Sequence, residues 1–220
     1  MIDLVGLVVL AGGESSRMGS PKALLKLPNG ERLIDFHIRH AKNLNVPVMV
    51  ADNGKNFYQD NFYQDNFFQD NFSQDNDVTI IDDYVQSDKT GKGAGALSAI
   101  ASAMQHLTAQ DSYLLVVSCD SLLGADWVFE RLQYLACADV MYVKGERDYP
   151  LLGLYRTDLL PQLRDYLDKD KRSVMQFLND KELKTVALLD DWVNLANCNT
   201  LDEFNLALKQ LPKSNQWLKN

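Results

Sequence analysis

Two glycines and two cationic residues follow the first apolar run of the chain. Leu4–Leu10 is rich in valine, as expected of a strand buried on both faces. Behind it, Gly12 and Gly13 lack a Cβ, so the backbone can approach a ligand closely and its N–H groups can form a cradle for an anion. Arg17 adds a planar fork and Lys22 a mobile point charge. The segment is predicted to bind phosphate; the alternative is a tight turn with incidental charges.

The spacing within this loop differs from the two most familiar phosphate-binding patterns. It is neither GxxxxGK[ST] nor GxGxxG. These differences argue against a P-loop NTPase and against a Rossmann dehydrogenase, while keeping the prediction of a phosphate-binding loop.

A carboxylate follows a second apolar run. Asp120 comes directly after Tyr113–Ser118, which reads as a buried strand, so its side chain is expected at the carboxyl edge of the sheet. A hard carboxylate there suits Mg²⁺, which keeps several waters and takes one or two protein oxygens besides substrate phosphates. The alternative is that Asp120 caps a helix or a loop.

A second carboxylate, Asp83, closes the predicted strand Val78–Ile81. A carboxylate can accept hydrogen bonds from N1–H and the amino group of guanine together, an arrangement that adenine does not offer. Asp83 therefore has the chemistry that such a contact would need. The alternative is that Asp82 and Asp83 are a solvated acidic pair.

Strand-like and helix-like segments alternate along the chain. The predicted strands are 4–10, 46–50, 78–81, 113–118, 138–143, 151–155 and 185–188, and the predicted helices are 33–44, 94–107, 127–135, 159–167, 174–178 and 201–211. This order indicates an α/β fold: a three-layer α/β/α sandwich around a mostly parallel, doubly wound sheet, with ligands at the carboxyl ends of its strands. Three hydroxyl side chains are predicted to cap helices: Thr157, Ser173 and Thr200.

A tandem repeat interrupts this pattern at residues 56–75, which read NFYQD, NFYQD, NFFQD and NFSQD. A five-residue period gives no continuous apolar face on a helix or on a strand. We expect a surface insertion in the connection between the second and third strands of one domain spanning residues 1–220. The alternative is that the seven aromatic side chains of the repeat bind a partner.

Composition excludes several classes of function. The formal net charge of −8 disfavours binding along a nucleic-acid backbone. The three cysteines have no CxxC spacing, which predicts reduced thiols in a cytoplasmic protein, and three histidines make a His-rich zinc site improbable. No stretch approaches the ~20 apolar residues that span a bilayer, so no membrane association is expected.

The first loop also carries a resemblance to a known family. LAGGESSRMGSPKALL, residues 10–25, is similar to the LAGGxSxRMGxxKxLL motif of nucleotidyltransferases in the molybdenum cofactor guanylyltransferase family. The resemblance extends over nearly the whole chain, through Ile81–Asp83, Gly91–Leu97, Ser118–Asp120, Gly145–Pro150, Arg172–Met175 and Asn197–Thr200. The sequence departs from the family at Ala51, where the family has Asn, at Gly91–Gly95, where it has GPLAG, and after Asp120, where it has Thr-Pro.

The resemblance implies a Rossmann-like nucleotidyltransferase fold and a set of site residues. It implies nucleotide contacts by Leu10, Ala11, Gly12, Gly13, Lys22, Asn53, Asp83, Gly95 and Asp120. It implies catalytic roles for Arg17, Lys22 and Asp120, with Asp120 as the metal ligand. Arg147, Arg172, Asn197 and Asn199 are candidates for contacting the pterin; for the asparagines the alternative is turn chemistry, and for the arginines an exposed side chain without a role.

The implied reaction transfers GMP from Mg-GTP to the phosphate of molybdopterin and releases pyrophosphate. Alternatives are a cytidylyltransferase for the same pterin, a sugar-phosphate nucleotidyltransferase and a nucleotide sensor without catalysis; Lys22 and Asp120 together argue against the sensor. The implied partners are a molybdenum-insertion protein and molybdoenzyme chaperones, and we expect a monomer.

Overall fold

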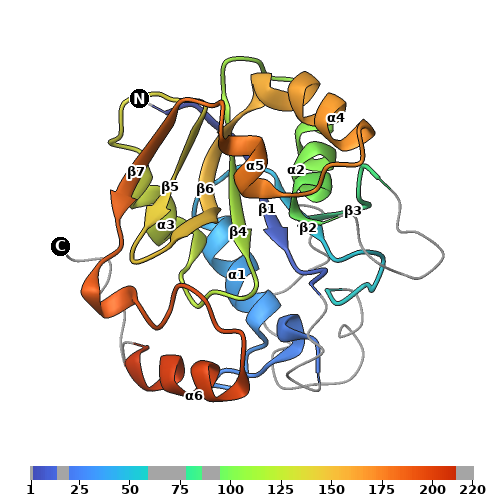
Figure 1. Ribbon diagram of the computed structural model, residues 1–220. Helices are drawn as coiled ribbons and strands as arrows, with labels where there is room; N and C mark the ends of the chain where they lie inside the picture. Colours follow the sequence, from blue (N-terminus) through green and yellow to red (C-terminus); the bar gives the residue numbers. More distant parts are fainter. Residues whose placement is uncertain (1, 14–19, 59–77, 86–94, 212–220) are drawn as a thin grey trace.

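The computed structural model describes residues 2–13, 20–58, 78–85 and 95–211, which fold around one seven-stranded sheet (Figure 1). The strand order is β3-β2-β1-β4-β6-β5-β7. The strands are β1 Leu4–Leu10, β2 Val48–Ala51, β3 Val78–Ile81, β4 Tyr113–Ser118, β5 Val140–Lys144, β6 Asp148–Arg156 and β7 Leu183–Ala187.

The sheet is mostly parallel, as predicted. β1 pairs in parallel with β2 and β4, β2 with β3, and β5 with β7, whereas β6 runs antiparallel to β4 and β5. The reversal follows from the connection between β5 and β6, because residues 145–147 are too few for the crossover that a parallel pair needs. The periodicity of the sequence identified β6 as a strand but not its direction.

Helices cover both faces of the sheet, which confirms the three-layer α/β/α sandwich (Figure 1). One core joins the sheet to α1 and α3, and the other joins it to α2, α4 and α5. The helices are α1 Leu33–Lys42, α2 Ala96–Gln105, α3 Ala125–Leu132, α4 Leu160–Asp168, α5 Val174–Leu178 and α6 Leu201–Gln210, with 3₁₀ turns at Lys22–Leu24, Thr157–Leu159 and Asp190–Trp192. Within the described ranges, no helix is long and apolar enough to cross a membrane.

The strand order reverses between β1 and β4, and this switch point positions several of the candidate site residues. From β1 the chain moves outward through β2 and β3, then returns to the other side of β1 as β4. These four strands are parallel, so their carboxyl ends meet at one edge of the sheet. The segments that leave them carry Gly12, Asn53, Asp83 and Asp120 to that edge, where open α/β sheets bind ligands.

Two of the three predicted helix caps are present. The Ser173 hydroxyl accepts from the Gln176 backbone N–H, and Thr200 forms a reciprocal capping box with Glu203. The prediction for Thr157 was wrong. Thr157 begins a 3₁₀ turn that leads into α4. Its hydroxyl forms hydrogen bonds with the backbone N–H and carbonyl of Ser112 in place of a backbone N–H of the helix.

The tandem repeat begins between β2 and β3, as predicted. Its first residues do not all lie on the surface. Of its residues the structure describes Asn56–Tyr58; residues 59–75 lie outside the described ranges. Phe57, the first aromatic residue of the repeat, is 6% exposed and belongs to the core beneath α1. The prediction of a surface insertion was therefore wrong for Phe57, because a repeat period says nothing about which copy packs against the fold.

Candidate active site

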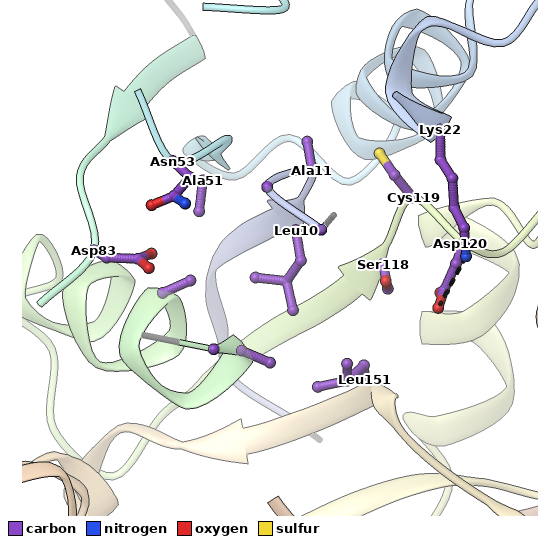
Figure 2. A pocket seen from close by; sticks show the side chains of 15 residues that line it. Leu10, Ala11, Lys22, Ala51, Asn53, Asp83, Ser118, Cys119, Asp120 and Leu151 are labelled. Carbon is purple, nitrogen blue, oxygen red and sulfur yellow. Dashed lines mark ion pairs between the residues drawn. The ribbon is translucent and has the colours of Figure 1, made fainter. Parts of the chain in front are cut away.

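A pocket of about 390 Å³ lies at the carboxyl edge of the parallel strands (Figure 2). All nine residues predicted to contact a nucleotide line it: Leu10, Ala11, Gly12, Gly13, Lys22, Asn53, Asp83, Gly95 and Asp120. The prediction did not name Ala51, Ala96, Ala99, Ser118, Cys119 and Leu151 as pocket residues. Most of these are neighbours of predicted residues at strand ends or at the start of α2, so the signal that could have found them was position in the fold.

The glycine loop packs directly against the segment that follows β2. The Ala11 N–H donates to the Ala51 carbonyl at 2.8 Å. A Cβ placed on Gly12 would lie 3.0 Å from the Asn53 Cβ and 3.3 Å from both the Asn53 nitrogen and the Asp52 carbonyl carbon. A side chain at position 12 would therefore crowd this close approach, whereas a Cβ on Gly13 would meet no atom of the described residues within 4 Å.

Two polar side chains lie together on one side of the pocket, Asn53 after β2 and Asp83 after β3 (Figure 2). Asn53 has φ of 60°, a left-handed conformation that asparagine tolerates better than most residues. The segment after Asp83 is held against α2, because the backbone N–H of Tyr84 donates to the Ser98 carbonyl and that of Val85 donates to the Ser98 hydroxyl. Both groups thus present amide or carboxylate oxygens from restrained backbone.

The first turn of α2 also faces the pocket. Gly95 precedes the helix with φ of 83°, a conformation that favours glycine, and its carbonyl accepts from the Ser98 N–H. Ala96 and Ala99 add small side chains. The backbone N–H groups of a first helical turn carry partial positive charge, which suits the phosphates of a nucleotide.

Lys22 and Asp120 meet on the opposite side of the pocket (Figure 2). The Lys22 Nζ lies 4.0 Å from Asp120 Oδ2 and donates to Asn199 Oδ1 at 3.1 Å. Asn199 reaches this position because the Glu203 carboxylate of the α6 capping box accepts from the backbone N–H groups of Asn199 and Thr200. A residue 177 positions away in the sequence thereby orients the lysine.

Backbone hydrogen bonds fix the segment that carries Asp120. The Cys119 N–H donates to the Leu10 carbonyl at 3.0 Å, and the Leu122 N–H donates to the Leu195 carbonyl at 2.7 Å. The buried ring of His37 donates from Nε2 to the Ser121 carbonyl at 2.9 Å. Sequence reasoning missed His37, since its helical spacing marks it as a core residue and nothing in the spacing pairs it with Ser121.

The oxygen donors around Asp120 suit a magnesium ion that depends on substrate for further ligands. Among the residues that the structure describes, no group of three or more His, Cys, Asp or Glu side chains forms a complete protein cage. The buried Asn197 Oδ1 has no hydrogen-bond partner within the described ranges, and the Cys198 N–H donates to the Asp120 carbonyl. The single carboxylate of Asp120 in the pocket fits the preference of Mg²⁺ for few protein oxygens plus phosphates.

The two cysteines beside Asp120 are not nucleophiles at neutral pH. Burial, followed by the charge of Asp120, raises the pKa of the Cys119 thiol, and the same causes raise the pKa of Cys198 to about 12. Because the thiolate is the reactive form, neither thiol is suited to covalent catalysis.

The remaining predicted residues lie elsewhere or outside the described ranges. Arg17 falls in the segment 14–19, which the structure does not describe. Arg147 is exposed in the turn before β6, 5.2 Å over the Tyr149 ring. Arg172 donates to the Leu167 carbonyl at the end of α4 and pairs with Asp170. Neither described arginine lines the pocket, whereas Asn199 contacts the pocket through Lys22.

The model of the MobA-like NTP transferase domain matches residues 7–185. The chain belongs to this family. It is therefore a nucleotidyltransferase, and its glycine loop and Asp120 both lie within the matched range. Asn197 and Asn199 lie beyond it.

Curated relatives match along most of their length. A probable molybdenum cofactor guanylyltransferase of Bacillus cytotoxicus is 27% identical over 205 residues, covering 90% of this chain and 92% of the relative. One from Peptoclostridium acidaminophilum is 23% identical over 214 residues, covering 89% and 85%.

Solved structures share the fold. Molybdopterin-guanine dinucleotide biosynthesis protein A from Archaeoglobus fulgidus superposes with a TM-score of 0.67 at 20% identity, covering 93% of this chain and 97% of that one. The 2-C-methyl-D-erythritol 4-phosphate cytidylyltransferase of Francisella tularensis superposes with a TM-score of 0.59 at 12% identity, covering 94% and 100%.

Proposed function

We propose that this nucleotidyltransferase transfers GMP from Mg-GTP to the terminal phosphate of molybdopterin and releases pyrophosphate. The observation that carries the proposal is the pocket itself, which has Asn53 and Asp83 on one side and the Lys22–Asp120 pair on the other. This arrangement suits a nucleotide whose base lies at the first side and whose phosphates lie at the second. The relatives of this chain, named as probable molybdenum cofactor guanylyltransferases, support guanine as the base and the molybdenum cofactor as the acceptor.

For this reaction the protein has to align the acceptor phosphate with the nucleotide and stabilise the charge on the leaving pyrophosphate. The acceptor phosphate is already an anion, so no general base is required. The Lys22 ammonium, held by Asn199 near Asp120, stabilises negative charge on the departing pyrophosphate. Arg17 is proposed to assist it.

Asp120, which lines the pocket, is the proposed magnesium ligand. Magnesium bound there would neutralise charge on the nucleotide phosphates and act as a Lewis acid toward the α-phosphorus. Lys22 and a magnesium ion held by Asp120 would thus share the neutralisation of the triphosphate charge.

Asp83 is the proposed reader of guanine. In Asp83→Asn, one acceptor becomes a donor, so the preference for GTP over ATP, measured as the ratio of kcat/KM values, should fall by about tenfold or more. Asp82→Asn is the matched control, because Asp82 is exposed and does not line the pocket. An unchanged preference in Asp83→Asn would remove this role from Asp83.

The deciding experiment offers GTP, CTP and UTP to the protein with molybdenum-loaded pterin as acceptor and measures pyrophosphate release and product mass. Release with GTP, together with a guanine dinucleotide product, is expected. A preference for CTP would favour a cytidylyltransferase. Two observations motivate this arm of the experiment: Ala51 replaces the family's Asn, and a cytidylyltransferase shares the fold. No turnover of this acceptor, with turnover of a sugar phosphate, would overturn the proposed acceptor.

A further inference from the structure

Asp52 is a buried carboxylate at the end of β2 that the chemistry above does not use. It is 0% exposed. Its Oδ2 accepts from the Phe57 N–H at 2.8 Å, and its backbone carbonyl accepts from the Lys55 N–H at 3.3 Å. Its Oδ1 has no hydrogen-bond partner among the described residues. Burying a carboxylate costs free energy that a single hydrogen bond compensates only in part, so its position has to be explained by what it holds in place.

Phe57, which Asp52 contacts, is anchored from two further directions. Phe57 is only 6% exposed and packs in the core that includes the buried face of α1. Its carbonyl accepts from Arg32 Nη1 at 2.8 Å, and the Arg32 guanidinium is fixed by two hydrogen bonds to Asp35, of 2.6 and 2.7 Å, at the start of α1. The turn from Asp52 to Phe57 is therefore held against the start of α1 by the contacts of Phe57 with Arg32, and these contacts are called the brace. Asp52 connects the brace to the end of β2.

The residue that this brace orients is Asn53. It follows Asp52 directly, has φ of 60° and lines the nucleotide pocket. Its backbone nitrogen and Cβ come so close to Gly12 that the two segments have no spare room between them. A small shift of the turn would therefore move Asn53 relative to the glycine loop and change the wall of the pocket.

We propose that Asp52 is a positioning residue for the nucleotide: through the Phe57 N–H it holds Asn53 in its left-handed conformation against Gly12. It contacts neither the reacting phosphates nor the Lys22–Asp120 pair. This inference rests on the proposed nucleotide site, but not on the identity of the base or of the acceptor.

Nucleotide binding without acceptor tests the inference. In Asp52→Ala, the Kd of Mg-GTP, measured by titration calorimetry, should rise by about tenfold, the effect of one buried hydrogen bond. With acceptor present, KM for the nucleotide should rise by a similar factor while kcat stays within about twofold. Asp52→Asn keeps an oxygen acceptor for Phe57 and should restore most of the affinity.

Asp126→Ala is the matched control for a purely structural effect. Asp126 is another hydrogen-bonded aspartate, accepting from His40 and Asn43 between α1 and α3, and it does not line the pocket. The Asp126→Ala substitution should lower the melting temperature and leave the Kd of Mg-GTP unchanged. Equal Kd values for Asp52→Ala and the wild type, or an equal weakening in both variants, would overturn the inference.

A second variant keeps the test open if Asp52→Ala does not fold. Arg32→Met removes the donor to the Phe57 carbonyl on the far side of the brace and should weaken Mg-GTP binding with little change in kcat; unchanged binding there would overturn the inference as well. A wild-type protein that binds no nucleoside triphosphate would instead refute the proposed function, so the two failures are distinguishable.

Discussion

The ammonium group of Lys22 lies between two oxygen atoms, 4.0 Å from the Asp120 carboxylate and 3.1 Å from the Asn199 amide. Both contacts come from segments distant in sequence, so the lysine is oriented before substrate arrives. An oriented cation of this kind does most for a reaction in which negative charge moves onto a leaving group.

Replacing Lys22 by alanine is therefore expected to lower kcat for pyrophosphate release by ~10²–10³. The melting temperature should stay near the wild-type value, because the side chain is partly exposed. Lys26→Ala, which removes an exposed lysine four positions on, is the matched control and should leave kcat unchanged. Near wild-type turnover in Lys22→Ala would rule out its role in the transfer step.

Gly12 and Gly13 should respond differently to alanine. In Gly12→Ala the new methyl group is forced against Asn53, so we expect a loss of about 1–3 kcal/mol in unfolding free energy together with weaker nucleotide binding. In Gly13→Ala the methyl group meets no atom of the described part of the chain within 4 Å, so stability should stay within about 0.5 kcal/mol of wild type.

Calorimetric titration with Mg-GTP and denaturant unfolding of both glycine variants check this expectation. Weaker binding in Gly13→Ala at unchanged stability would indicate that the ligand itself approaches the loop backbone. Unchanged stability in Gly12→Ala would contradict the close packing of the two segments.

At the scale of elements, the sequence revealed the residues that follow strands better than the residues that support them. Gly12, Asp83 and Asp120 could be predicted because each closes an apolar run, and the parallel order of the strands brings such positions together. His37 and Asp52 could not, because their partners, Ser121 and Phe57, are set by packing. Arg172 reads as a substrate contact, yet nearby carbonyls at the end of α4 hold its guanidinium.

The contact between α1 and the segment after β4 makes stability depend on pH. Burial lowers the pKa of His37 from 6.5 to about 4, although the hydrogen bond to the Ser121 carbonyl opposes this shift. Its Nδ1 is buried without a hydrogen-bond partner among the described residues, so a proton added there would find no acceptor. The folded protein therefore keeps the ring neutral where the unfolded chain protonates it.

The sign follows from the two pKa values. Below pH 6.5 the unfolded state binds a proton that the folded state does not. The free energy of unfolding therefore decreases as the pH is lowered from 6.5 to about 4. The slope is about 1.4 kcal/mol per pH unit, which predicts a loss of about 2 kcal/mol between pH 6.5 and pH 5. His37→Gln can still donate to Ser121 without titrating, and urea unfolding should show this contribution missing. Parallel pH profiles for variant and wild type would contradict it.

At the scale of the whole molecule, most of the pocket is built on one half of the sheet. The parallel half, β3-β2-β1-β4, supplies the glycine loop, Asn53, Asp83 and Asp120 from its carboxyl edge. The C-terminal segment before α6 crosses back to this edge and orients Lys22 through Asn199. The geometry of Lys22 and Asp120 thus depends on the C-terminal segment, although the family match ends at residue 185.

The structure describes contacts of the tandem repeat at its first copy only. The contacts of Phe57 with Asp52 and Arg32 come from the first copy. Deleting residues 61–70, which are two whole copies, leaves nine residues between Tyr58 and Val78. Nine extended residues span about 30 Å, enough to return along a four-residue strand of about 13 Å to the start of β3.

This deletion is expected to leave the melting temperature within about 2 °C of wild type, since that corresponds to less than about 1 kcal/mol in a chain of this size. Nucleotide binding should also be unchanged. Phe57→Ala is the contrasting variant: it empties a core site and should cost about 3–5 kcal/mol. Thermal unfolding and Mg-GTP titration of both proteins decide the matter. If the deletion destabilises the protein as much as Phe57→Ala, the later copies contribute to the fold; if it spares both properties, the first copy alone anchors the wall of the nucleotide pocket.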